Sequence, residues 1–157
     1  MKKLAVIIAA ASFACAAPVA LMAAEHGMKM EHGSHMEHKG DVAHEEVVDG
    51  VKATFKVMSM AEHMKAMKME LPKGMKETHH IAVEFKDAKT GKAITAGEVN
   101  LKIQGPDKAD QTKALTAMQG HFGADFDLSK KGKYGVMSKF KVKDGKVRSA
   151  KFWYEVK

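Results

Sequence analysis

The chain has 157 residues, a formal net charge of +7 and a single cysteine. That cysteine, Cys15, lies near the N-terminus. We expect it to be removed with the N-terminal apolar run, so the mature chain would have no cysteine. No disulfide could then form, and thiolate copper centres, iron–sulfur clusters, c-type haem attachment and thiol-disulfide chemistry would be excluded by ligand type. The lysines are spread along the chain, without the basic clusters and aromatic platforms of a nucleic-acid-binding protein. The length suits one ordinary domain with a tail and is too short for two sizeable cores.

The N-terminus is typical of a secretory signal. Two lysines precede an apolar run over residues 4–17, Pro18 ends the run, and Ala23 and Ala24 offer alternative cleavage positions. The run is shorter than the roughly 20 residues of a membrane span, and no later stretch approaches that length. We therefore expect residues 1–24 to be a cleaved signal peptide and the mature chain to be periplasmic, with no transmembrane segment.

Residues 25–46 form a polar segment in which Glu-His recurs every six residues, twice followed by Gly and once by Lys. It has no aliphatic periodicity and cannot bury enough apolar surface to offset its ordering entropy, so we predict a disordered tail. Cleavage after Ala23 would leave a free amine with His26 as third residue, a chelate that holds Cu(II) in a square plane. Cleavage after Ala24 would remove it. The candidate metal ligands of the tail are His26, Met28, Met30, His32, His35, Met36 and His38.

Residues 47–157 are predicted to form the folded domain, because hydrophobic residues alternate along most of this region with a period of two. Such alternation describes antiparallel strands with one dry face and one wet face. Six strands are expected, around residues 51–57, 81–85, 99–103, 122–128, 134–142 and 150–156. Many short strands at this spacing favour a mainly β fold, an immunoglobulin-like antiparallel β-sandwich.

Turn residues support the same fold. Asp144-Gly145 predicts a tight hairpin between the last two strands, residues 89–91 predict a turn after the second strand, and residues 105–107 end the third. Tyr134 follows Gly132 in a Gly-x-Tyr pattern at the start of the penultimate strand. Immunoglobulin-like folds place there a tyrosine whose hydroxyl ties down the preceding corner.

One short methionine-rich helix is predicted over about residues 60–69. Ser59 and Glu62 form a capping box, and Pro72 prevents continuation. Met60, His63, Met64 and Met67 then fall on one helical stripe, which is either a packing surface or a set of ligands.

Histidine and methionine are concentrated in one part of the chain: residues 25–80 hold eight of nine histidines and nine of thirteen methionines. A thioether is soft and has no proton to lose, so it selects Cu(I) over Zn(II), whereas imidazole binds copper in either oxidation state, and zinc. The mixture suits copper, with Cu(I) favoured and Cu(II) an option. Alternatively, the histidine-rich tail is a solvated linker without specific ligands, or a general binding segment for zinc or nickel.

A better-defined site is expected in the domain. His79 and His80 open a strand, so their rings point to opposite faces and at most one joins a given site. Met118 and His121 stand just before a strand, where ligands are easily presented. The candidate ligands of the domain are His63, Met64, Met67, His79 or His80, Met118 and His121.

Three stretches carry a family resemblance: "HHIAVEFKDAKTGKAITAGEVNLKIQGPDK", "LTAMQGHFGADFDLSKKGKYGV" and "FKVKDGKVRSAKFWYEV". Over about residues 79–156 the chain resembles the YtkA-like group of exported Ig-like domains, related in style to CopC-type periplasmic copper proteins. The resemblance implies a β-sandwich with histidine and methionine at loops and strand ends, and copper handling. The matching positions are His79, His80, Met118 and His121.

The sequence therefore predicts an exported copper-binding protein of metal homeostasis, a chaperone that sequesters or delivers Cu(I) without turnover. The tail would capture the ion and the domain would hold it. A membrane-bound copper-dependent or copper-exporting protein is the expected partner.

Two alternatives remain open. One is a non-catalytic assembly partner of a membrane oxidase or efflux complex that uses the methionine stripe as an apolar interface. The other is an enzyme, a copper oxidase that consumes Cu(I) and oxygen.

Overall fold

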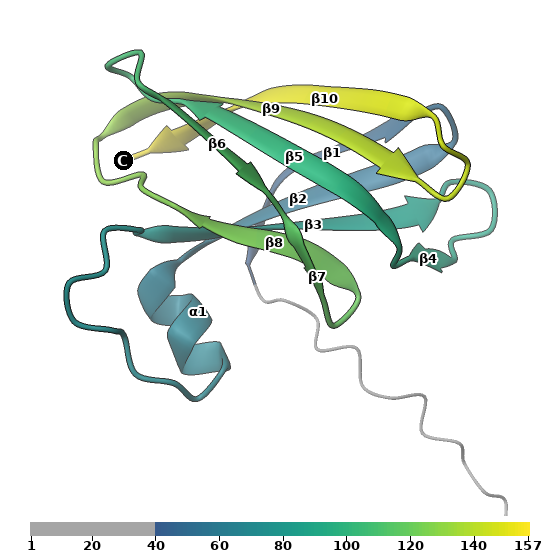
Figure 1. Cartoon of the computed structure of the whole chain (residues 1–157). Helices are drawn as coiled ribbons and strands as arrows, with labels where there is room; N and C mark the ends of the chain where they lie inside the picture. Colours follow the sequence, from purple (N-terminus) through teal and green to yellow (C-terminus); the bar gives the residue numbers. More distant parts are fainter. Residues whose placement is uncertain (1–39) are drawn as a thin grey trace, which may run out of the picture. The chain divides into compact units, whose positions relative to one another are not determined.

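The computed structural model describes residues 40–157, and these form two antiparallel sheets joined by short turns (Figure 1). The signal peptide and the tail ligands, from His26 to His38, lie outside the described residues. None of the helices in the described part is long and apolar enough to cross a membrane.

The first sheet has the strand order β1-β2-β3-β8-β7, and a short strand, β4, also pairs with β3. These strands are β1 (Asp41–Val48), β2 (Val51–Ser59), β3 (His79–Asp87), β4 (Ala93–Ile94), β7 (Thr116–Met118) and β8 (His121–Phe126). The second sheet has the order β10-β9-β5-β6, built from β5 (Gly97–Gln104), β6 (Asp110–Ala114), β9 (Gly132–Val142) and β10 (Val147–Val156).

The core lies between the inner faces of the two sheets, as the alternation predicted. Phe55, Phe122 and Leu101 are fully buried there. The rings of Phe85 on β3 and Phe140 on β9 stack with centroids 4.6 Å apart, which joins the two sheets directly. Buried aromatic pairs of this kind add to the stabilisation by area alone. The predicted Ig-like β-sandwich is confirmed, and each of the six predicted strands is present.

The predicted turns are also confirmed. The hairpin at Asp144-Gly145 connects β9 to β10, and Gly145 has a φ of 73°, a conformation that favours glycine. The hydroxyl of Tyr134 donates to the backbone carbonyl of Lys130 at 2.8 Å and accepts from the Lys130 amide at 3.1 Å. The tyrosine therefore ties down the corner before β9 as predicted.

Two boundaries differ from the prediction. Residues 41–46, expected to belong to the disordered tail, lie in β1, where backbone pairing with β2 orders a polar sequence and His44 stacks on Phe152 at 4.7 Å. The helix α1 (Met60–Ala66) ends about three residues early, because Met67 caps it and Lys68 adopts a positive φ of 56°. The short strands β4, β6 and β7 were not predicted, since each is too short to show alternation.

Candidate metal centre

A second buried layer lies on the outer face of the first sheet. Antiparallel pairing places His80 of β3 opposite Asp125 of β8, and Ala82 opposite Gly123. Outward positions of a sandwich normally face water, yet His80 is 1% exposed, Ala82 1% and His121 5%. Figure 1 shows the reason: α1 lies against this sheet, on the side away from β5 and β9. His80 and His121 are therefore largely shielded from solvent on this face.

The helix α1 is placed by its N-terminus. Ser59, the last residue of β2, accepts a hydrogen bond from the Glu62 amide, and the Glu62 side chain accepts from the Ser59 amide. This capping box satisfies donors that the first helical turn leaves unpaired. The Met60 amide also donates to the carbonyl of Thr78, just before β3, at 2.8 Å. Met60 and His63 are consequently the buried residues of the helix.

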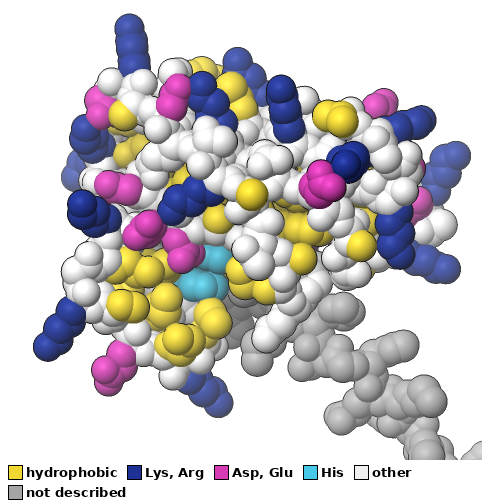
Figure 2. Space-filling model, viewed as in Figure 1, with side chains coloured by type: hydrophobic (Ala, Val, Ile, Leu, Met, Phe, Trp, Pro, Cys, Tyr) yellow, Lys and Arg dark blue, Asp and Glu magenta, His cyan; other side chains and the backbone are white. Residues whose placement is uncertain are grey.

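Three histidine rings come together beneath α1. His63 stacks on His80 with ring centroids 3.8 Å apart and planes 5° from parallel. His80 meets His121 edge-on, with centroids 6.2 Å apart at 82°. One ligand atom each from His63, His80 and Asp125 also lies within 4.8 Å of the others, close enough for a metal ion. In Figure 2, histidine side chains reach the viewed surface as a small patch bordered by hydrophobic and acidic side chains.

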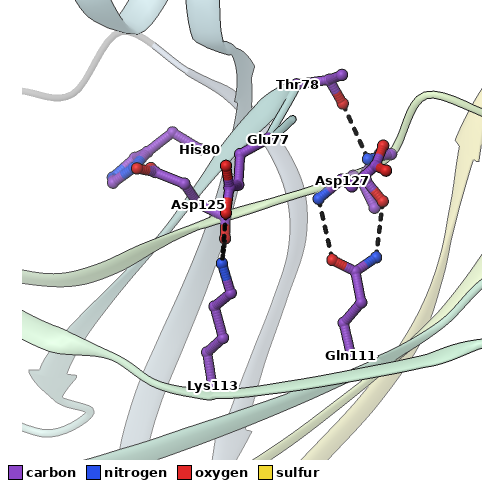
Figure 3. A network of polar contacts seen from close by, with 8 residues as sticks. Glu77, Thr78, His80, Gln111, Lys113, Asp125 and Asp127 are labelled. Atoms are coloured by element: carbon purple, nitrogen blue, oxygen red, sulfur yellow. Dashed lines mark hydrogen bonds and ion pairs between the residues drawn. The ribbon is translucent and has the colours of Figure 1, made fainter. Parts of the chain in front are cut away.

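Asp125 fixes the orientation of His80. Its carboxylate Oδ1 lies 2.6 Å from Nδ1 of His80. A carboxylate only accepts, so the proton of the neutral imidazole lies on Nδ1 and Nε2 carries the ring's lone pair. Asp125 is itself held from the other sheet, because Lys113 of β6 donates to the Asp125 carbonyl at 2.7 Å and to Glu77 at 3.1 Å (Figure 3).

The electrostatics favour neutral rings. Burial, and then the neighbouring His80, lower the pKa of His63 below its ordinary value, against the opposing effect of Asp125. Burial and His80 likewise lower the pKa of His121, and the charge of Glu84 partly offsets this. A metal binds only deprotonated imidazole. Lowered pKa values therefore keep these histidines competent as ligands at and somewhat below neutral pH.

The structure brings together three of the predicted domain ligands and separates others. His63, His80 and His121 meet. Of the adjacent histidines only His80 belongs to the cluster, since Nδ1 of His79 lies 2.8 Å from the Thr78 hydroxyl instead. This agrees with the expectation that at most one of the two joins a site.

The methionines are divided in the same way. Met118 pairs with His121 across a two-residue turn, Gln119-Gly120, in which both residues have positive φ. Met64 is partly buried, whereas Met67 is 46% exposed, so the residues of the predicted stripe are divided between the protein interior and the solvent. Whether any of these residues binds metal stays a prediction.

The sequence reasoning missed Asp125, Gly123 and two buried methionines. Met58 is the cross-strand neighbour of His80. Met60 belongs to the predicted helical stripe, but it was not predicted to be a ligand, and it is only 2% exposed. A signal was present: since Phe122, Ala124 and Phe126 face the core, the alternate residues of β8 share the outer face with His121.

No protein-family model matches the sequence, and none of the curated proteins matches it. Solved structures do match in fold. One is a copper-bound variant of FetP from uropathogenic Escherichia coli strain F11, with a TM-score of 0.56 and 11% identity, covering 74% of this chain and 90% of that one.

Another is a DUF4426 family protein from Pseudomonas aeruginosa PAO1, with a TM-score of 0.55 and 13% identity, covering 72% of this chain and 96% of that one. At these identities the likeness is one of fold. The resemblance to exported Ig-like domains is therefore confirmed at the level of the β-sandwich.

Proposed function

We propose that this protein is an exported, periplasmic copper-binding protein that sequesters or delivers Cu(I), and binds Cu(II) as well, without turnover. The observation that carries the proposal is the cluster of His63, His80 and His121, buried on a face of the sandwich that the hydrophobic core does not use. Three imidazole rings lie side by side there, with centroids 3.8 Å and 6.2 Å apart, which brings several nitrogen donors within a short distance.

The donor chemistry supports copper. The cluster offers imidazole nitrogen, and two soft thioethers, Met58 and Met60, are buried in the same layer. Imidazole together with thioether matches Cu(I) better than hard divalent ions. The FetP variant that shares this fold was solved with copper bound, which is in line with copper as the ion proposed for this chain.

Delivery would begin in the tail and end at a partner. The tail residues from His26 to His38 would capture the ion, and the cluster would hold it. Met67, Met69 and Leu71 follow α1 and are 46%, 55% and 51% exposed, so a flexible apolar surface lies beside the site. A membrane-bound copper-dependent or copper-exporting protein would dock there.

A zinc site is the second candidate, and the position of Asp125 favours it. His63, His80 and Asp125 offer two nitrogens and one oxygen, a donor set that zinc accepts. Zinc would need the carboxylate as a ligand, whereas Cu(I) would leave it as the hydrogen-bond acceptor of His80.

Competition between metals separates the two candidates. The chain would be offered Cu(I), Ag(I), Cu(II), Zn(II) and Ni(II), and its melting temperature followed, since an ion that binds only the folded state raises it by mass action. The tail histidines and methionines would be replaced by serine in a parallel variant. We expect Cu(I) and Ag(I) to raise the melting temperature of both proteins. Stabilisation by zinc alone, or by no metal, would refute the copper proposal.

A further inference from the structure

The geometry of the histidine cluster assigns unequal roles to its three rings, an inference that rests on the proposed metal-binding function. We propose that the ion sits between Nε2 of His80 and Nε2 of His121, above the backbone of Gly123, and that His63 covers this seat without being a ligand. The seat is thus a two-nitrogen site, a coordination that suits Cu(I) or Ag(I).

Gly123 marks the seat. A Cβ built on Gly123 would lie 2.6 Å from Nε2 of His80 and 3.4 Å from Nε2 of His121. Both ring nitrogens therefore converge on one point above this residue. Metal–imidazole bonds measure about 2.0–2.1 Å, so small ring rotations would bring both nitrogens into bonding range of an ion there. Any side chain at position 123 would fill the space.

The floor of the seat is flat because two small residues form it. Ala82 is the cross-strand partner of Gly123, and this pair lies between the pair His80–Asp125 and the start of β8 at His121. Continuing the register by one residue places Glu84 opposite His121. Each histidine of the seat thus stands across from an acidic residue of the neighbouring strand, with the small pair between them.

Asp125 selects the ligand atom. Its carboxylate Oδ1 lies 2.6 Å from Nδ1 of His80 and holds the ring so that Nε2 is the nitrogen that faces the Gly123 position. Asp125 acts through His80 and is a positioning residue in this arrangement.

His63 is excluded as a ligand for the same ion by its orientation. An imidazole lone pair lies in the plane of its ring. The rings of His63 and His80 are stacked, with planes 5° from parallel and centroids 3.8 Å apart, so their in-plane lone pairs cannot converge on one point. The ring of His121 stands at 82° to that of His80, which permits convergence. His63 therefore acts as a stacked cover that keeps water from the seat.

The test replaces each ring by phenylalanine in the full chain whose tail histidines and methionines are serine, and measures Cu(I) affinity by competition with a chromophoric chelator. We expect His80→Phe and His121→Phe to weaken Cu(I) binding by more than about 100-fold, and His63→Phe by less than about threefold, since it preserves the stack. Asp125→Asn should fall between them, at about 10–100-fold. An equal loss in His63→Phe and His121→Phe would overturn the proposal.

A glycine pair supplies the matched control. Gly123 has no positive φ, so alanine is allowed by the backbone there and would act by filling the seat. At Gly135 the atoms nearest to an added Cβ belong to the ring of the exposed Trp153, the first at 3.2 Å. We expect Gly123→Ala to abolish Cu(I) binding and Gly135→Ala to leave it unchanged. Full binding by a folded Gly123→Ala protein would refute the seat.

The outcomes distinguish this inference from the proposed function. If the tail-substituted parent binds no Cu(I), the copper function of the domain fails. If the parent binds Cu(I) but His63→Phe abolishes binding, the function stands and the division of roles fails. Circular dichroism of every variant verifies folding, and the ring replacements decide the matter should Gly123→Ala not fold.

Discussion

On each outer face of the sandwich a glycine lies against a ring side chain, but one ring is buried and the other is exposed. On the first sheet, Gly123 lies against the ring of His80, and on the second, Gly135 lies against the ring of Trp153. His80 is 1% exposed, whereas Trp153 is 65% exposed. Both rings occupy outward positions of a strand. The difference comes from α1, which covers one face and leaves the other to solvent.

This contrast supports the covered face as the place of the proposed function. The open face needs no special explanation, since single exposed aromatic residues are common on protein surfaces. The covered face is different, because buried histidines carry a desolvation cost that a hydrophobic layer would avoid. A sequence that keeps three histidines under a helix when apolar residues would pack more easily points to a ligand.

Truncation of Met60 should produce the largest effect on the covered face. Met60 is 2% exposed under α1, so Met60→Ala should lower the free energy of unfolding by about 2–5 kcal/mol, through lost burial and the cavity left behind. Met67→Ala, at the C-cap of this helix, is the control, because Met67 is 46% exposed and its truncation should cost little. Chemical denaturation measures both. Equal losses would mean that α1 does not pack as described.

Removal of the helix cap should have the next largest effect. Ser59→Ala removes both hydrogen bonds of the Ser59 hydroxyl, leaves the bond from the Ser59 amide to the Glu62 carboxylate, and should destabilise the protein by about 1 kcal/mol. The loss should be local to α1, so backbone amides of the helix should exchange with solvent faster while those of β9 stay protected. Uniformly faster exchange across both sheets would contradict the view that α1 opens independently of the sandwich it covers.

Acid should weaken the metal-free protein through its buried and partly buried histidines. The folded state lowers the pKa of His63, His79 and His121 from the ordinary value of 6.5, with burial as the first cause in each case. Below about pH 6.5 the unfolded chain therefore binds more protons than the folded one, so stability is complete above this pH and falls as the pH drops.

Denaturation of the metal-free protein between about pH 7.5 and about pH 5.5 checks this sign. A bound metal should shift the loss to lower pH, because coordinated imidazole resists protonation. Stability that is constant or rises on acidification would show that the histidines are not buried in their neutral form.

The open face should give the smallest effect. Trp153→Ser removes a ring that is 65% exposed and should change the free energy of unfolding by less than about 0.5 kcal/mol. Cu(I) affinity should not change at all. A marked loss of copper binding in this variant would mean that the exposed outer face of the second sheet, and not the face covered by α1, carries the proposed function.

The sequence predicted the sandwich well because one physical signal, alternation by two, dominates long strands such as β2, β9 and β10. It failed for β1, whose Asp41–Val48 segment is polar and is ordered by pairing with β2 and not by its own hydrophobicity. Short strands such as β7 carry too few residues for any period to appear.

The candidate site was predicted in part for a similar reason. His63, His80 and His121 stood out by residue type, but their meeting depends on which strands pair, and pairing between β3 and β8 spans a long stretch of chain. Asp125 and Gly123 have no unusual composition signal. Only the register, which places them beside the histidines, gives them a role.

X-ray absorption at the copper edge tests the central claim most directly. The protein with serine in place of the tail histidines and methionines would be loaded with one equivalent of Cu(I) and its donors identified. The account predicts bound copper with imidazole nitrogen donors, and their loss from the spectrum of the His121→Phe variant. Copper that fails to bind, or a spectrum of His121→Phe identical to that of the parent, would contradict the account.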